Sequence, residues 1–161
     1  MPLLKSVIIS LVFTLHYTSV ISQTSLKFEK VGKDSFMKVD VATLIALQEL
    51  SESDWMKLMK KNGFKTVSDQ AGKRIYSLGT YMLRMQLISK NTAHNLLSID
   101  WVDSFAKKTS MLKYIEAELK DFHIETSGGF DMYGYKGYLI GIEKKRIEYG
   151  KLSERILIRK Q

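Results

Sequence analysis

The chain has 161 residues, a mean hydropathy of −0.12 and a formal net charge of +8, from 25 Lys and Arg against 17 Asp and Glu. A chain of this size buries roughly two thirds of its unfolded surface, so one domain can form a core without disulfides. Cysteine is absent, which excludes thiol catalysis, cysteine-ligated zinc and iron–sulfur clusters.

The first 22 residues differ from the rest, because Lys5 is their only charged residue and residues 7–21 are largely apolar. This layout is typical of a secretory signal peptide, and we expect cleavage after Ser22. The alternative is a retained membrane anchor, but His16 interrupts the stretch, and a spanning helix needs about 20 consistently apolar residues. Export without cysteines favours a bacterial periplasmic or extracellular protein over a small eukaryotic secreted domain.

Residues 23–42 are a mixed stretch that we interpret as an extended lead-in with one short strand. A helical pattern follows over residues 41–50. Ser51 then begins a second helix, because its hydroxyl can accept a hydrogen bond from an N–H of the first turn. Gly63 ends that helix, since glycine adopts a left-handed conformation without a Cβ penalty.

Period-two alternation and glycine-rich turns predict four strands after Gly63, over residues 64–67, 74–78, 81–88 and 96–102. In the third strand we expect one set of alternate residues to face the core: Tyr81, Leu83, Met85 and Leu87. A further helix is predicted over residues 109–121, with Thr109 or Ser110 as its cap. Its apolar stripe consists of Phe105, Leu112, Ile115, Leu119 and Phe122. Four more strands are predicted over residues 122–126, 131–135, 137–145 and 152–159.

The order helix, four strands, helix, four strands indicates an internal repeat. At a shift of 57 residues, Tyr76 overlays Tyr133 and Tyr81 overlays Tyr138. We therefore divide the single domain 43–161 into candidate repeats 43–103 and 104–161. The expected fold is α+β, with two tandem helix and antiparallel-sheet modules and the helices packed on one face of the sheet.

This layout, over residues 43–159, resembles exported bacterial proteins built from small helix-plus-antiparallel-sheet modules. They include the β-lactamase inhibitor protein family and the small outer-membrane assembly lipoproteins. A capped helix leading into residues 60–64, Lys-Lys-Asn-Gly-Phe, is also similar to uncharacterised secreted proteins with Lys-Lys-x-Gly-Phe. The resemblance lies in element order and implies no functional residue, because this chain lacks the lipid-attachment cysteine of the lipoproteins and the disulfides of the inhibitors.

The sequence contains no recognisable active site. Beyond the predicted signal peptide, the histidines are His94 and His123, and no serine lies in a glycine-flanked elbow. Glu116 and Glu118 cannot share a helix face at a spacing of two. We therefore predict no catalytic residue, no metal site and no cofactor, and an enzyme of unrecognised type remains the third hypothesis.

Lysines gather near the two main predicted helices, at Lys57, Lys60, Lys61, Lys107, Lys108 and Lys113. If the halves are duplicated, the two groups could lie side by side and attract anionic lipid headgroups or acidic proteins. The alternative is structural, since lysines near helix C-termini complement the helix dipole. Nucleic acid is a disfavoured partner, because the basic residues form no recognised motif and the chain is predicted to be exported.

Aromatic residues concentrate in the predicted strands, at Tyr76, Tyr81, Trp101, Tyr133, Tyr135 and Tyr138. Tyrosines on an uncovered sheet face would suit a protein partner, because they provide a large contact area at low entropy cost. The alternative is strand propensity together with core packing. Our leading expectation is an exported, non-enzymatic binding protein of unknown partner, and the second is a polyanion or lipid-surface binder.

Overall fold

The computed structural model describes residues 25–70, 72–80, 84–103, 112–148 and 151–161. Within these ranges the fold is α+β, with one eight-stranded antiparallel sheet, a two-stranded hairpin and three α-helices. The predicted signal peptide lies outside the described residues. No helix in the described ranges is long and apolar enough to cross a membrane.

The elements follow one another in nearly the order that the sequence predicts. The chain enters through a hairpin of β1 (Phe28–Val31) and β2 (Asp34–Met37), followed by α2 (Val41–Glu49) and α3 (Glu52–Lys61). The next four strands are β3 (Lys65–Gln70), β4 (Lys73–Thr80), β5 (Arg84–Asn91) and β6 (Leu96–Asp103). Helix α4 (Lys113–Leu119) continues into the 3₁₀ helix η1 (Lys120–Phe122). The last strands are β7 (His123–Ser127), β8 (Phe130–Tyr135), β9 (Tyr138–Glu148) and β10 (Lys151–Lys160).

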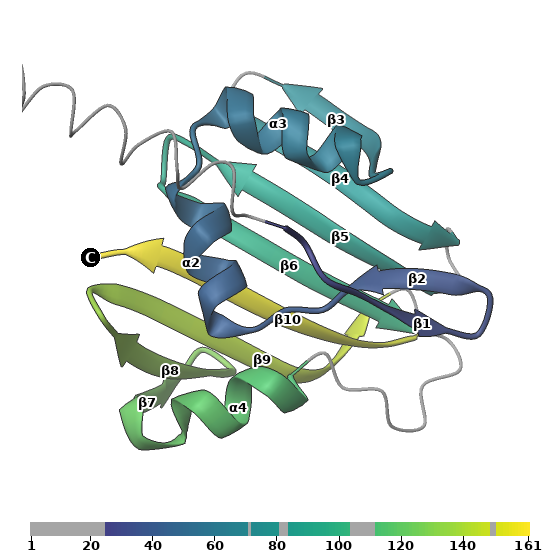
Figure 1. The fold of residues 1–161 in the computed structure, drawn as a ribbon. Helices are drawn as coiled ribbons and strands as arrows, with labels where there is room; N and C mark the ends of the chain where they lie inside the picture. The colour runs from purple at the N-terminus through teal and green to yellow at the C-terminus, as the bar shows by residue number, and fades with distance from the viewer. Residues whose placement is uncertain (1–24, 71, 81–83, 104–111, 149–150) are drawn as a thin grey trace, which may run out of the picture.

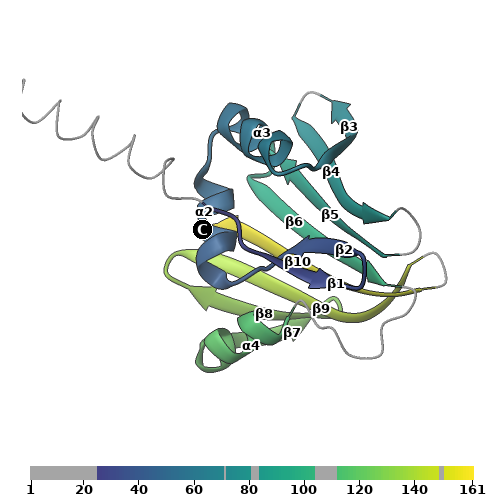
Figure 2. The ribbon, with the colours of Figure 1, turned by 45° about the vertical axis from the view of Figure 1, so that its right-hand side comes forward.

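The large sheet has the strand order β3-β4-β5-β6-β10-β9-β8-β7, and every neighbouring pair is antiparallel. Two four-stranded meanders therefore meet at the β6–β10 pair, where Ser98 lies opposite Leu157. Strands β3 and β7 form the two edges. Helices α2, α3 and α4 and the β1–β2 hairpin lie on the same side of the sheet (Figures 1 and 2).

The two N-terminal helices begin at side-chain caps. Asp40 accepts a hydrogen bond from the Thr43 backbone N–H at 2.7 Å, and the Ser51 hydroxyl accepts one from the Asp54 N–H at 3.1 Å. Such a cap stabilises a helix by about 1 kcal/mol. Gly63 follows α3 with a φ of 79°, so both the predicted start and the predicted stop of this helix are confirmed.

The hydrophobic core lies between the sheet and the layer formed by the helices and hairpin. Trp55 of α3 packs edge-on against Tyr76 of β4, with ring centroids 5.2 Å apart, and Phe36 of β2 packs against Trp101 of β6 at 4.1 Å. Edge-to-face pairs of this kind add about 0.5–1.5 kcal/mol to the burial of the rings. Along the strands, the core is completed by Ile88, Leu97, Ile99, Ile140, Ile142, Ile156 and Ile158.

Residues 25–42, the described part of the predicted lead-in 23–42, fold differently from the expected single strand. They contain the antiparallel β1–β2 hairpin, which turns at Gly32 with a φ of 65°. Phe36 and Met37 of β2 are buried in the core. The hairpin thus covers part of the sheet that the helices leave open, and the single-strand prediction was wrong.

The predicted inward face of β5 was also wrong. Ile88, paired with Tyr76 and Ile99, belongs to the core, so Gln86 and Lys90 share its side of the strand. Met85 and Leu87 therefore face the other side; of the remaining two predicted residues, 81 and 83, nothing is described. Two polar side chains replace apolar ones on the covered face because backbone groups of β2 and α2 supply their hydrogen bonds.

The stripe predicted for the third helix is partly confirmed. Leu112, Ile115 and Leu119 are buried in the core. Phe122 is 43% exposed, because the chain tightens into η1 before this residue and the α-helical spacing no longer applies. Phe105 and the cap candidates Thr109 and Ser110 lie outside the described residues.

Candidate functional site

Most of the aromatic residues predicted for partner binding lie in the core. Tyr76, Trp101, Tyr133 and Tyr138 are buried on the side of the sheet that the helices and hairpin cover. The rings occupy this side because they remove the largest apolar area from water there. These four side chains therefore do not line the opposite side of the sheet.

The other two aromatic residues in that group differ from these four. Tyr135 is half-buried, packs edge-on against Phe122 at 4.8 Å and donates a hydrogen bond to Glu118 at 3.3 Å. Its ring thus connects the end of β8 with α4 and η1. Tyr81 lies outside the described residues.

The side of the sheet opposite the helices is here called the open face, and it carries an apolar area over β8, β9 and β10. Strand pairing places Leu157 next to Gly141, and Gly141 next to Met132, across β10, β9 and β8. A hollow of about 410 Å³ lies over these strands. It is lined by Leu96, Glu125, Ser127, Phe130, Met132, Leu139, Gly141, Leu157 and Arg159.

Glycine at position 141 lets neighbouring side chains lie close to the backbone at the floor of the hollow. A Cβ there would lie 3.1 Å from the sulfur of Met132 and 3.3 Å from Cδ1 of Phe130. Gly134 makes a similar approach possible, since its Cβ would lie 2.9 Å from Cδ1 of Ile124. Side chains of β7 and β8 therefore lie over backbone, which gives the hollow a floor of mixed aliphatic and aromatic atoms.

Next to the hollow, the open face carries a closed polar network. The Arg155 guanidinium donates to Asp100 at 2.5 Å, and the Ser98 hydroxyl donates to the other oxygen of Asp100 at 2.9 Å. Glu143 lies 3.8 Å from the same arginine. These charged groups are already paired with one another, so they are poorly available for pairing with a ligand.

The charged residues of the hollow are not committed in this way. Arg159 and Glu125 are both exposed, and neither side chain has a hydrogen-bond or ion-pair partner among the described residues. Arg159 lies opposite Leu96 on one side and Leu139 on the other. The hollow thus combines an apolar floor with one cation and one anion that are available for a partner.

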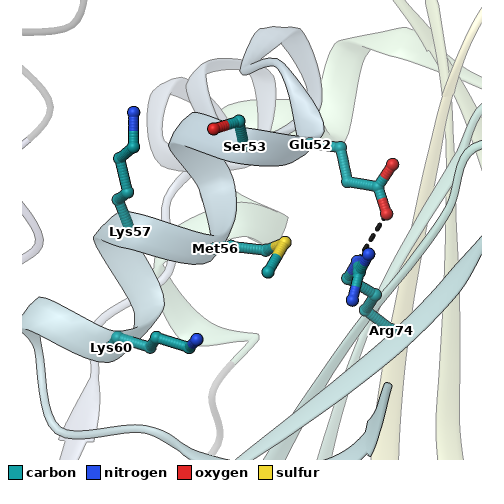
Figure 3. Close-up of a pocket in the computed structure, with 6 residues that line it drawn as sticks. All are labelled: Glu52, Ser53, Met56, Lys57, Lys60 and Arg74. Carbon is teal, nitrogen blue, oxygen red and sulfur yellow. Dashed lines mark hydrogen bonds and ion pairs between the residues drawn. The ribbon is translucent and has the colours of Figure 1, made fainter. Parts of the chain in front are cut away.

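A second concavity, the α3 cleft, lies between α3 and β4 and has a volume of about 360 Å³ (Figure 3). Two of the predicted anion-binding lysines, Lys57 and Lys60, line it together with Arg74. Arg74 is already paired with Glu52 and Asp69. Lys57 lies 3.5 Å from a carboxylate of the same helix, so an anion in this cleft would compete with acidic residues for most of the cations.

The two helices that carry the described lysines are not adjacent. Helices α3 and α4 lie over opposite ends of the sheet, with α2 between them (Figures 1 and 2). Lys61 is exposed at the end of α3 but does not line the cleft, and Lys113 is the first residue of α4. Lys107 and Lys108 lie outside the described residues. The expectation that α3 and α4 bring their lysines together was therefore wrong.

The two histidines among the described residues, His94 and His123, are exposed. His94 lies in the turn between β5 and β6, and His123 begins edge strand β7. Across the part of the chain that the structure describes, no group of three or more His, Asp or Glu side chains could hold a metal ion.

The comparisons with known proteins give no relative for this fold and site. No protein-family model, no curated protein and no solved structure matches the chain.

The residues of the hollow could not be predicted, because the start of β9 and the later part of β10 are apolar on both faces. In residues 138–142, Tyr-Leu-Ile-Gly-Ile, alternation does not distinguish the covered side from the open one. One signal was present in Gly141, since a glycine inside a strand often marks the close approach of another group.

Proposed function

We propose that this protein is an exported, non-enzymatic binding protein that contacts another protein through the open face of its sheet. The observation that supports this proposal is the hollow of about 410 Å³, with its apolar floor, on the face opposite the helices. Leu96, Leu139 and Leu157 remain only half-buried there. A partner that fills the hollow would remove this remaining apolar surface from water, which favours association.

We further propose that the sheet consists of two tandem copies of one helix-plus-four-strand module. Thr66 pairs with Tyr76 and His123 pairs with Tyr133, so both members of the second pair lie 57 residues after those of the first. In each hairpin the register then shifts by one residue, at Val67 and at residue 124. A shared bulge at the same offset supports duplication more strongly than shared alternation does.

The centre of the sheet supports the same proposal. Across the β6–β10 junction, Ile99 pairs with Ile156, and these two residues are also 57 positions apart. Ile99 and Ile156 would then be equivalent positions of the two modules. Duplication would also account for the width of the open face, where the polar network lies at the β6–β10 junction and the hollow lies over β7 to β10.

Binding of anionic surfaces by the α3 lysines is the second candidate function. Its support is that Lys60 lines the α3 cleft without a side-chain partner among the described residues. Because attraction between exposed charges is screened by salt, this candidate predicts that partners are lost at high ionic strength. Contact through the open face is driven mainly by apolar burial, so it should survive the same change.

A capture experiment with the chain from residue 23 onward, at low and high salt, distinguishes these candidates. Leu157→Arg places a charge in the hollow and should abolish salt-resistant capture of one protein from an envelope or medium extract. The double variant Lys57→Gln and Lys60→Gln should retain it. Gln70→Arg, on the exposed edge strand β3, serves as the matched control for an added arginine.

Three results would count against the main proposal. Capture that is salt-sensitive and lost only in the lysine variant would favour the anion-binding candidate. Capture that Leu157→Arg leaves unchanged would exclude the hollow as the contact. Measurable hydrolytic activity without any captured protein would replace both candidates with an enzyme.

A further inference from the structure

We infer that the hollow accepts a partner segment in which an apolar side chain lies between an acidic and a basic residue. This inference rests on the proposed function, since it specifies the chemistry of the segment that contacts the open face. The acidic residue is bound by Arg159 and the basic residue by Glu125, while the apolar side chain fills the hollow between them.

The preference for an acidic residue follows from two positions of the β6–β10 pair. Asp100 lies opposite Arg155, and the two form an ion pair at 2.5 Å. Arg159, four residues further along β10, lies opposite Leu96 instead. Arg155 therefore has its own salt bridge, whereas Arg159 has an apolar neighbour.

A carboxylate of the partner supplies the ion-pair partner that Arg159 lacks among the described residues. Guanidinium groups bind carboxylates through two parallel hydrogen bonds, which are roughly twice as strong as bonds between neutral groups. Since Arg159 flanks an apolar surface, a docked segment would also exclude water from this ion pair. The partner's acidic residue would therefore add affinity as well as orientation.

The preference for a basic residue follows from Glu125, on the far side of the hollow from Arg159. Glu125 pairs with Met132 across β7 and β8, and its carboxylate has no partner among the described residues. Strand β7 is three strands away from β10 in the sheet order, which corresponds to about 14 Å. An extended segment advances 3.3 Å per residue, so its acidic and basic residues would be about four positions apart.

The opposite charges also argue against a lipid or polyanion on this surface. A uniformly anionic ligand would satisfy Arg159 but would meet the carboxylate of Glu125 within the same hollow. Like charges at close range oppose binding. A polypeptide segment can present both signs with an apolar side chain between them.

The test is a random peptide library displayed on phage and selected against the chain from residue 23 onward. Enriched peptides should contain Asp or Glu and Lys or Arg about four positions apart, with Leu, Met, Phe or Tyr between them. Arg159→Gln should remove the acidic preference and Glu125→Gln the basic one. Each variant should weaken binding of the best peptide by about tenfold, the usual effect of losing one charged hydrogen bond. Lys65→Gln, on exposed strand β3, is the control and should leave binding unchanged.

The outcomes separate this inference from the proposed function. Enrichment of apolar peptides without paired charges, with binding lost in Leu157→Arg, would overturn the inference and leave the open face as the contact. Enriched peptides that still bind Leu157→Arg would overturn both. Failure to enrich any peptide would overturn the inference, and the capture experiment would then decide the proposed function by itself.

Discussion

The side-chain amide of Gln86 hydrogen-bonds both backbone groups of Met37. Its nitrogen donates to the Met37 carbonyl at 3.0 Å, and its oxygen accepts from the Met37 N–H at 3.0 Å. The amide thus takes the place of a neighbouring strand's peptide group and holds β2 against β5. Both residues are buried, so water cannot replace these bonds.

Replacing Gln86 with leucine should therefore destabilise the protein by about 2–4 kcal/mol, because two buried backbone groups lose their partners. The measurement is the free energy of unfolding from chemical denaturation, together with hydrogen exchange of the Met37 amide. That amide should exchange much faster in the variant. Gln70→Leu, at an exposed position of β3, is the control and should change stability by less than about 0.5 kcal/mol. Equal effects of the two substitutions would contradict the role assigned to Gln86.

Lys90 provides a second buried connection, between β5 and the end of α2. Its ammonium donates to the carbonyls of Leu47, Gln48 and Leu50 at 3.2, 2.9 and 2.6 Å. Burial lowers the pKa of this lysine, and the negative charges of Glu49 and Glu52 oppose that effect. The helix C-terminus itself is electronegative, which helps to retain the charged form.

Lys90→Met should cost about 1–3 kcal/mol, because the carbonyls at the end of α2 lose their donor within the core. Chemical denaturation at neutral pH measures this cost. Lys73→Met, on the exposed part of β4, is the matched control. A variant as stable as the native chain would mean that relief from burying a charge outweighs the lost hydrogen bonds.

Tyr138 and Glu49 should make stability depend on pH at both extremes. The tyrosine hydroxyl donates to Glu49 at 2.5 Å. Burial and this bond raise the pKa of Tyr138 to about 12, while the same bond lowers the pKa of Glu49 below its usual 4.5. The contribution of Glu49 is thus present above pH 4.5 and is lost as the pH falls further, whereas that of Tyr138 is lost as the pH rises above 10.

Tyr138→Phe should therefore lower stability by about 1 kcal/mol at pH 7, at the low end for a charged hydrogen bond because Glu49 is partly solvated. The difference from the native chain should shrink at pH 3 and again above pH 11. Denaturation curves at the three pH values test this expectation. A difference that stays constant with pH would indicate that only packing of the ring has been changed.

Expression of the full chain in a bacterium with a periplasm should yield a processed protein that begins at Gln23. The expectation follows from the apolar stretch of residues 7–21 and the compact residues before Ser22. Intact mass and N-terminal sequencing of the exported fraction measure it. Val20→Arg should block processing, whereas a full-length chain retained in the membrane fraction would favour the anchor.

Most elements of the fold could be predicted because each has a local signal. Ser51 and Gly63 mark the ends of α3, and glycines separate most of the strands. The β1–β2 hairpin had one such signal, Gly32, but β2 lacks apolar alternation, since its two apolar residues Phe36 and Met37 are adjacent. Its burial depends on Gln86, which is 49 residues away in the sequence.

The site was harder to predict because it depends on which face of each strand is covered. Tyr76 and Tyr133 were expected at a binding surface, yet large rings gain more from the core. The free charges of Arg159 and Glu125 become visible only when the strand pairing is known. Spacing along the chain does not reveal that Arg159 lies opposite a leucine.

The bulges at Val67 and Ile124 affect the tendency of the protein to aggregate through the edges of its sheet at high concentration. Each adds one unpaired residue to an outermost strand, and their side chains are 55% and 57% exposed. At each bulge, the backbone donors and acceptors of the edge strand are out of register with those of an added strand. This holds at both edges of the sheet. Growth into ribbons or fibrils by strand addition is thereby discouraged. The molecule can expose the apolar hollow of its open face without pairing edge to edge with other copies of itself.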